Sequence, residues 1–178
     1  MKTSQQWWNE VKADSEKTAA WLVKQWRGEV TAAFRIEKLA RQYTEADGRE
    51  YTILKTIAGQ EKQHAGWVRD LLTARDIQVD ETDIVAAEDR YWAKTLPGIK
   101  DFATGSAVAA HAEKMRLERI RTIVDDTDSP ADVKDVFARI LKDEVWHEEA
   151  FRKLSTPEAM AATEGDYKLG REALGLEA

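Results

Sequence analysis

The tetrapeptide Glu-x-x-His occurs twice in this chain, first as Glu61-Lys-Gln-His64 and again as Glu144-Val-Trp-His147. The two copies lie 83 residues apart, and together they use two of the three histidines in the sequence. In an α-helix, residues three apart are separated by about 60° around the axis and by about 4.5 Å along it. Each pair therefore points both side chains to one side of a helix, and the repeat favours two similar helical units that face one another.

A lone glutamate precedes each copy on an otherwise apolar helical face, Glu29 before the first and Glu113 before the second. Two antiparallel helices place residues side by side when those residues are equally far from the turn. The midpoint of Glu29 and Glu61 is position 45, and that of Glu113 and Glu144 falls between 128 and 129. Both midpoints lie in turn-like sequence. Each lone glutamate should thus lie level with its Glu-x-x-His partner, and packing the two hairpins together gathers six side chains at one depth.

Apolar residues recur at spacings of three and four through most of the chain, which is the pattern of helices with one buried face. We predict long helices at about 15–43, 48–75, 101–124 and 130–154, with shorter ones at 5–11, 82–94 and 157–174. Asp47 and Ser129 are the expected N-caps of the second and fourth long helices. The connection of roughly two dozen residues after the second lets the third run parallel to it. We therefore predict an all-α fold: a ferritin-like four-helix bundle of two repeated hairpins joined by a long crossover, with short N- and C-terminal helices.

The composition fits one domain over residues 1–178, with the core bundle at about 16–154. Hydrophobic residues make up 43% of the 178, which is enough for a substantial core. The net charge of −6 comes without a clustered basic stripe, so we expect no nucleic-acid partner. We find no apolar run long enough to cross a bilayer and no apolar core of a secretion signal at the start. We expect a soluble, cytoplasmic protein.

The candidate ligands also satisfy a charge balance. Four carboxylates buried together are costly unless they bind cations or take up protons. Two divalent ions balance four carboxylates and leave two neutral imidazoles as nitrogen ligands. The chain has no cysteine, which excludes disulfides, thiolate catalysis, iron–sulfur clusters and cysteine-bound zinc. Oxygen and imidazole donors suit iron, manganese or zinc. The predicted metal ligands are Glu29, Glu61, His64, Glu113, Glu144 and His147.

This ligand pattern resembles that of the ferritin-like di-metal carboxylate superfamily, which includes ferritins, bacterioferritins, rubrerythrins and the ribonucleotide reductase small subunit. In that superfamily two helices each supply a glutamate and two others each supply Glu-x-x-His. The six residues fill this pattern, and the resemblance covers residues 16 to 154. It also implies that Asp143, just before Glu144, accepts a hydrogen bond from His64, and that Gln60 holds the equivalent position for His147. The alternative is that Asp143 and Gln60 are ordinary flanking residues.

Several positions depart from individual members of the superfamily. Rubrerythrins carry a further glutamate one turn after the third-helix ligand, where this chain has Arg116. Rubrerythrins and bacterioferritins often have a tyrosine seven residues after the first glutamate, where Ile36 stands. Bacterioferritins bind haem through a methionine at the position of Lys62. The chain also cannot form a cysteine-rich rubredoxin module. The resemblance is therefore to a rubrerythrin-like member without that module.

The function implied by the resemblance is that of a non-haem di-iron or di-manganese oxidoreductase. Its partners would be dioxygen or hydrogen peroxide and an electron donor that the sequence does not identify. Three alternatives stay open: a ferroxidase or iron-storage protein of ferritin type, a structural bundle that holds zinc without redox chemistry, and an oxygenase acting on an organic substrate. We expect a homo-oligomer, with a dimer favoured.

Other polar and aromatic residues receive structural interpretations. His111 is two residues from Glu113 and points to a different side of the helix, so we expect it on the surface. Arg116 is expected to extend its stem to solvent, and the alternative is that it pairs with a carboxylate of the site. The tryptophans fit core or subunit-interface packing, and Trp7 and Trp8 would anchor the N-terminal segment to the bundle or to a second subunit.

Overall fold

The computed structural model describes residues 2–80 and 95–176, and their regular structure is entirely helical. The helices are α1 (Ser4–Lys12), α2 (Ser15–Tyr43), α3 (Arg49–Thr73), α5 (Phe102–Asp125), α6 (Ala131–Leu154) and α7 (Pro157–Ala173), with a short 3₁₀ helix, η2, at Leu96–Gly98. These bounds confirm the predicted all-α fold and match the long helices to within a few residues. The short helix predicted at 82–94 lies outside the described residues.

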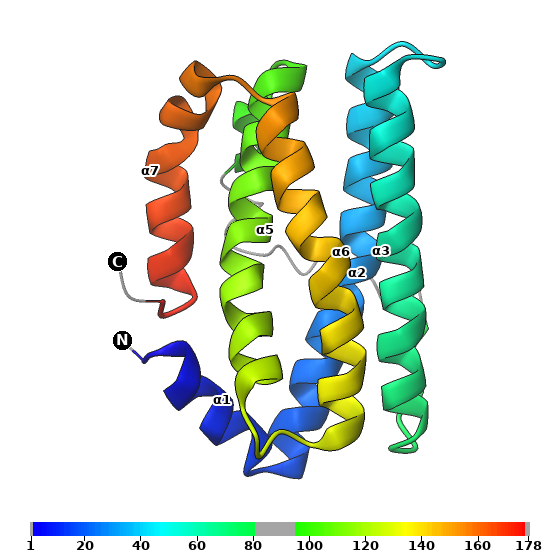
Figure 1. Cartoon of the computed structure of the whole chain (residues 1–178), viewed down its shortest axis with the longest axis vertical. Coiled ribbons are helices and arrows are strands. Elements are labelled where there is room, and N and C mark those ends of the chain that lie inside the picture. The colour runs from blue at the N-terminus through cyan, green and yellow to red at the C-terminus, as the bar shows by residue number, and fades with distance from the viewer. Residues whose placement is uncertain (1, 81–94, 177–178) are drawn as a thin grey trace.

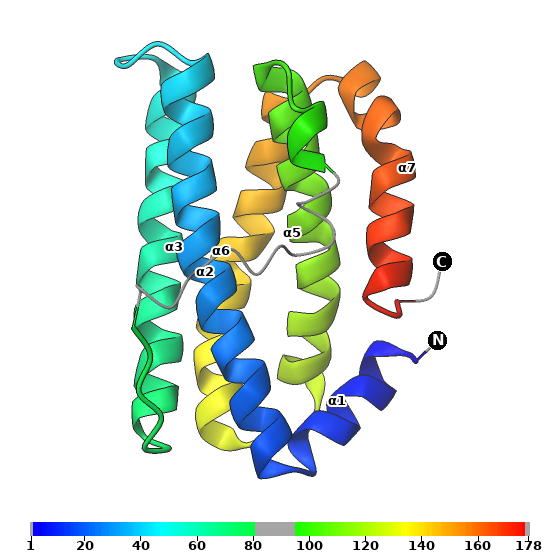
Figure 2. The same ribbon diagram turned by 180° about the vertical axis from the view of Figure 1, so that it is seen from behind.

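The four long helices form two antiparallel hairpins, α2–α3 and α5–α6 (Figure 1). The colour gradient shows α3 and α5 running in the same direction, as a crossover connection requires (Figure 1). Viewed from behind, α7 lies against α5 on the side away from α2 and α3 (Figure 2). In the described part of the chain, no helix has the length and apolar character that a membrane span requires.

Two apolar clusters fill the bundle, one on each side of a polar layer. The first cluster includes Trp26, Ala65, Ile120 and Ile140, and the second includes Ile36, Ala58, Ala110 and Phe151. Each long helix contributes to both clusters, and between its two contributions stands one of the predicted ligand glutamates. The apolar periodicity of every helix is thus interrupted at the same height. Burial of the two clusters fixes the helices and brings the glutamates together.

The helix N-termini show two differences from the sequence predictions. Gly48, not Asp47, is the N-cap of α3 and provides no side-chain hydrogen bond. Pro130, not Ser129, is the N-cap of α6. The Ser129 hydroxyl instead donates to the Ile123 carbonyl at 2.7 Å and accepts from the Trp8 indole N–H at 2.8 Å. The N-cap signal at Ser129 is local, whereas one of its two observed partners, Trp8, lies 121 residues away in α1.

Replacing Ser129 with alanine should lower the free energy of unfolding by about 2 kcal/mol, because the fully buried Trp8 indole N–H loses its acceptor. A domain of this size loses about 2–4 °C in Tm for each kcal/mol. Thermal melts followed by circular dichroism would measure the shift. In a Trp8→Phe background, which lacks the indole donor, the same substitution should cost clearly less. An equal cost in both backgrounds would show that the hydroxyl does not act through Trp8.

Candidate metal site

All six predicted ligands lie in the polar layer and face its centre. Glu29, Glu61, His64, Glu144 and His147 are completely buried, and Glu113 is 6% exposed. Their donor atoms form two overlapping groups in which all atoms lie within 4.8 Å of one another. We call the first, Glu29, Glu61, His64 and Glu144, the Glu29 set, and the second, Glu61, Glu113, Glu144 and His147, the Glu113 set. Glu61 and Glu144 belong to both sets, which is the arrangement expected of carboxylates that bridge two ions.

Each imidazole presents its Nδ1 atom to the carboxylates. Nδ1 of His64 lies 3.5 Å from Glu144 Oε1 and 3.8 Å from Glu29 Oε2. Nδ1 of His147 lies 3.0 Å from Glu61 Oε1 and 3.6 Å from Glu144 Oε2. The two rings, contributed by α3 and α6, have centroids 5.8 Å apart. Nitrogen and oxygen donors thus converge from opposite hairpins.

The outer nitrogens of both imidazoles are held by one pair of side chains, Gln60 and Asp143. Asp143 Oδ2 lies 3.0 Å from His64 Nε2, and Gln60 Oε1 lies 3.0 Å from His147 Nε2. The Gln60 amide nitrogen donates to the other Asp143 oxygen at 3.0 Å. These are the two contacts that the family resemblance implied. We call this pair the Gln60–Asp143 clamp.

The clamp determines which imidazole nitrogen is available as a ligand. An ionised Asp143 can only accept, so His64 donates from Nε2 and the Gln60 amide nitrogen must face Asp143. The Gln60 oxygen then faces His147, which also donates from Nε2. In a neutral imidazole the proton is thereby placed on Nε2, and Nδ1 keeps its lone pair. Both lone pairs point toward the carboxylates, which is the orientation that metal ligation requires.

Replacing Asp143 with alanine should weaken metal binding by about 10–100-fold, because both imidazoles lose the contacts that orient them. Isothermal titration with Mn²⁺ measures the change. Asp135, an exposed aspartate of the same helix, provides the control, and Asp135→Ala should bind like the unaltered protein. Unchanged affinity in Asp143→Ala would show that the clamp does not orient the ligands.

Burial and mutual repulsion divide the carboxyl groups into two protonation classes. Burial, then the neighbouring charges of Glu144 and Glu61, raises the pKa of Glu113 well above its ordinary value. Burial and Glu144 likewise raise the pKa of Glu61. Burial would also raise the pKa of Glu144, but Arg116 and the two histidines hold that pKa well below its ordinary value. Without a metal, the surroundings therefore favour the protonated form of Glu61 and Glu113 and the ionised form of Glu144.

Burial and neighbouring charges also shift the pKa values of the two imidazoles. Burial would lower the pKa of His64 and of His147, but the adjacent carboxylates outweigh it, and both pKa values are raised. The carboxylates thus favour a positive charge on or beside each imidazole. Protons supply part of that charge, and a divalent cation would displace them.

The orphaned donor atoms of the cluster fit a metal centre. Among the described residues, the cluster atoms without a hydrogen-bond partner are Glu29 Oε2, both carboxylate oxygens of Glu61 and of Glu144, and Nδ1 of His64 and of His147. Buried polar atoms are rarely left unpaired in this way. All are oxygen or imidazole nitrogen, the donor types that suit iron, manganese or zinc. The residues therefore match the group that the sequence predicts.

Two residues near the site lie where the sequence analysis did not expect them. His111 is 2% exposed, not on the surface, because α7 covers this side of α5 and Tyr167 stacks on the imidazole at 4.7 Å. Arg116 does not extend to solvent: its side chain is 18% exposed and its guanidinium pairs with carboxylates of the cluster. Arg116 stands three residues after Glu113 on one helical face, and this spacing was the signal available in the sequence.

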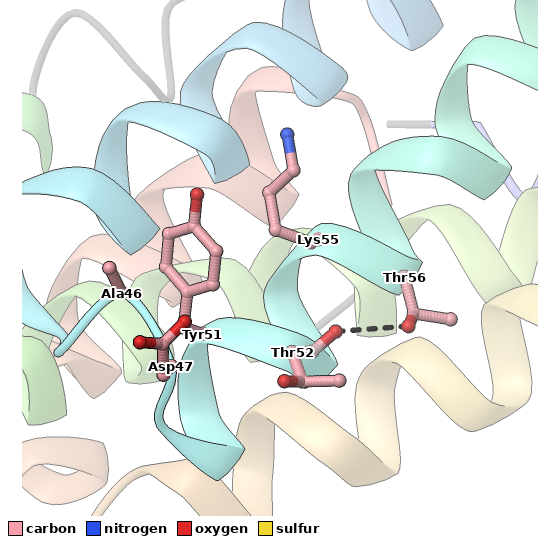
Figure 3. A pocket seen from close by; sticks show the side chains of 6 residues that line it. All are labelled: Ala46, Asp47, Tyr51, Thr52, Lys55 and Thr56. Atoms are coloured by element: carbon pink, nitrogen blue, oxygen red, sulfur yellow. Dashed lines mark hydrogen bonds between the residues drawn. The ribbon is translucent and has the colours of Figure 1, made fainter.

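A surface hollow of about 440 Å³ lies away from these ligands, at the α2–α3 turn (Figure 3). It is lined by Ala46, Asp47, Tyr51, Thr52, Lys55 and Thr56. Lys55 pairs with Glu37 at 2.8 Å. The hollow contains none of the six candidate ligands, so it is separate from the metal site.

Comparison with known proteins agrees with the fold. The family model for rubrerythrin matches residues 21–155, a span that contains all six candidate ligands. No curated protein and no solved structure matches the chain. The matched span covers most of the four long helices and well over half of the sequence. The chain belongs to the rubrerythrin family, within the ferritin-like superfamily.

Proposed function

We propose that this protein is a non-haem di-iron, or di-manganese, oxidoreductase that reacts with dioxygen or hydrogen peroxide. The observation that carries the proposal is the pair of buried ligand sets that share Glu61 and Glu144. Two shared carboxylates would hold two ions close together, and each ion would have its own imidazole and its own terminal glutamate. When bound, a pair of redox-active ions would supply the electrons that reduce the oxidant.

The chain's own residues would prepare this site in three ways. The Gln60–Asp143 clamp fixes the Nδ1 lone pairs of both imidazoles toward the ions. The two apolar clusters exclude bulk water from the polar layer. Burial raises the pKa values of Glu61 and Glu113 and so favours their protonated forms, and ion binding would release any protons they carry. A dry site with preset donors favours ions and small oxidants such as dioxygen and hydrogen peroxide over bulky substrates.

Metal analysis and oxidant reaction test the proposal directly. Protein produced in iron-replete medium should contain iron in stoichiometric amount, and the reduced, iron-loaded protein should develop ferric absorption in the near ultraviolet when oxygen or peroxide is added. A protein that binds zinc alone, or that binds iron without reacting, would contradict the oxidoreductase proposal. Size-exclusion chromatography should show a dimer, whereas a large closed assembly with an iron core would indicate storage.

A further inference from the structure

Arg116 places a permanent positive charge inside the carboxylate cluster. Its Nη2 atom donates to Glu29 Oε1 and lies 3.3 Å from Glu144 Oε1, and its Nη1 atom lies 3.6 Å from Glu61 Oε2. The side chain reaches these oxygens from α5, with 18% of its surface exposed. A guanidinium keeps its charge under all ordinary conditions and presents a planar set of donors to carboxylates. The cluster therefore contains a cation of its own.

This cation is not shared equally between the two ligand sets. The three carboxylates that Arg116 contacts are all three carboxylates of the Glu29 set. Among the described residues, no ion pair joins Arg116 to Glu113 or to His147, the two ligands found only in the Glu113 set. Glu61 and Glu144 are common to both sets, so the difference lies in the unshared glutamates: Glu29 is paired with Arg116 and Glu113 is not.

The consequence for ion binding follows from charge and from shared atoms. An ion in the Glu29 set would compete with the guanidinium for Glu29 Oε1 and would sit beside a fixed positive charge. An ion in the Glu113 set leaves the hydrogen bond from Arg116 to Glu29 in place and meets the contacts of Arg116 only at the shared Glu61 and Glu144. The two halves of the site offer similar donors but different local charge.

We infer that the two half-sites fill in sequence, on the basis of the di-metal function proposed above. The Glu113 set binds the first ion, and Arg116 acts as the internal counter-cation of the Glu29 set until a second ion displaces it. Arg116 is a positioning and charge-setting residue in this scheme, not a ligand. Over a range of metal concentration, the protein would therefore hold one ion, whereas a site with two equal halves would hold two.

Titration with Mn²⁺ under isothermal calorimetry separates the two binding steps. The unaltered protein should show two steps, the second at least about tenfold weaker, because that ion must displace a charge-assisted hydrogen bond. Arg116→Gln removes the charge and should bring the second step to within a few fold of the first. Arg116→Lys keeps a charge and should retain the gap. Arg121→Gln, which removes an exposed arginine from the same helix, controls for net charge.

Anomalous diffraction from unaltered protein given one equivalent of Mn²⁺ provides a test that needs no variant. The expected density lies among Glu61, Glu113, Glu144 and His147. Density first in the Glu29 set, or an unchanged gap in a folded Arg116→Gln protein, would overturn the role inferred for Arg116. Two equal binding steps in the unaltered protein would overturn sequential filling. Each of these results would leave a di-metal site intact. Absence of Mn²⁺, Fe²⁺ and Zn²⁺ binding in every variant would overturn both the inference and the proposed function.

Discussion

Glu144→Ala is expected to abolish uptake of both metal ions at concentrations that saturate the unaltered protein. Glu144 is completely buried and belongs to both ligand sets, so its loss removes a donor from each ion at once. Loss of a residue that only orients a ligand costs about 10–100-fold in affinity, and loss of a shared ligand should exceed that range for both ions. Metal analysis after gel filtration and titration with Mn²⁺ measure the stoichiometry and the affinities.

Two comparison variants make this result specific. Glu113→Ala removes a ligand from one set only, so it should eliminate the tighter ion and leave weak binding in the other set. Glu149→Ala changes an exposed glutamate of the same helix, paired with Lys153, and should bind metal normally. If Glu144→Ala still binds one ion tightly while its helical content is unchanged, the two sets do not share this carboxylate.

Removing the metal is expected to destabilise the protein, and more so as the pH rises. An ion present at about 1,000 times its Kd adds about 4 kcal/mol to the free energy of unfolding. For a domain of this size, that corresponds to about 10 °C in Tm. Differential scanning calorimetry of chelator-treated and Mn²⁺-loaded protein at about pH 6 and about pH 8 would measure the difference at each pH.

The direction of the pH effect follows from the groups whose pKa values are shifted. The pKa values of Glu61 and Glu113 are raised from an ordinary value of 4.5, and those of His64 and His147 from 6.5. Their stabilising contribution to the metal-free protein is complete below those ordinary values and is lost as the pH rises through the raised ones. Glu144, whose pKa is lowered, changes the stability only at acidic pH. Its stabilising contribution is present above 4.5 and is lost as the pH falls through its lowered pKa.

Bound ions take the place of these protons, so the metal-loaded protein should not lose this stability as the pH rises. The Tm difference between loaded and metal-free protein should therefore widen from about pH 6 to about pH 8. Buffers with different ionisation enthalpies should reveal proton release during Mn²⁺ titration. A Tm difference that narrows with rising pH would show that the cluster holds no displaceable protons.

Much of the fold and the meeting of the six side chains could be predicted because both depend on regular geometry. Equal rise along two antiparallel helices places Glu29 level with Glu61, and the apolar spacing puts both on the buried face. The structure brings the six together as predicted, while their role as metal ligands stays a prediction that the experiments above test. The contacts of Asp143 and Gln60 came from family resemblance, since no helical period identifies them.

What the sequence analysis missed depends on contacts between distant segments. His111 was placed on the surface because a bundle helix was assumed to bury one face, whereas α7 buries a second face of α5. Ser129 carries a local N-cap signal, but its hydroxyl bonds to Trp8 in α1. The usual preference of long cationic side chains favours solvent for Arg116 over the alternative of pairing with a site carboxylate, but the concentrated negative charge of the buried carboxylates outweighs that preference.

The Gln60–Asp143 clamp also bears on how a duplicated protein can diverge. Gln60 and Asp143 occupy the same position in the two copies of the hairpin, each one residue before a ligand glutamate. In a dimer of identical hairpins this position would be filled twice by one residue type, and two aspartates would repel each other. A single covalent chain can divide the donor and the acceptor between its copies. One polypeptide that contains both hairpins can thus carry a different residue at this position in each half.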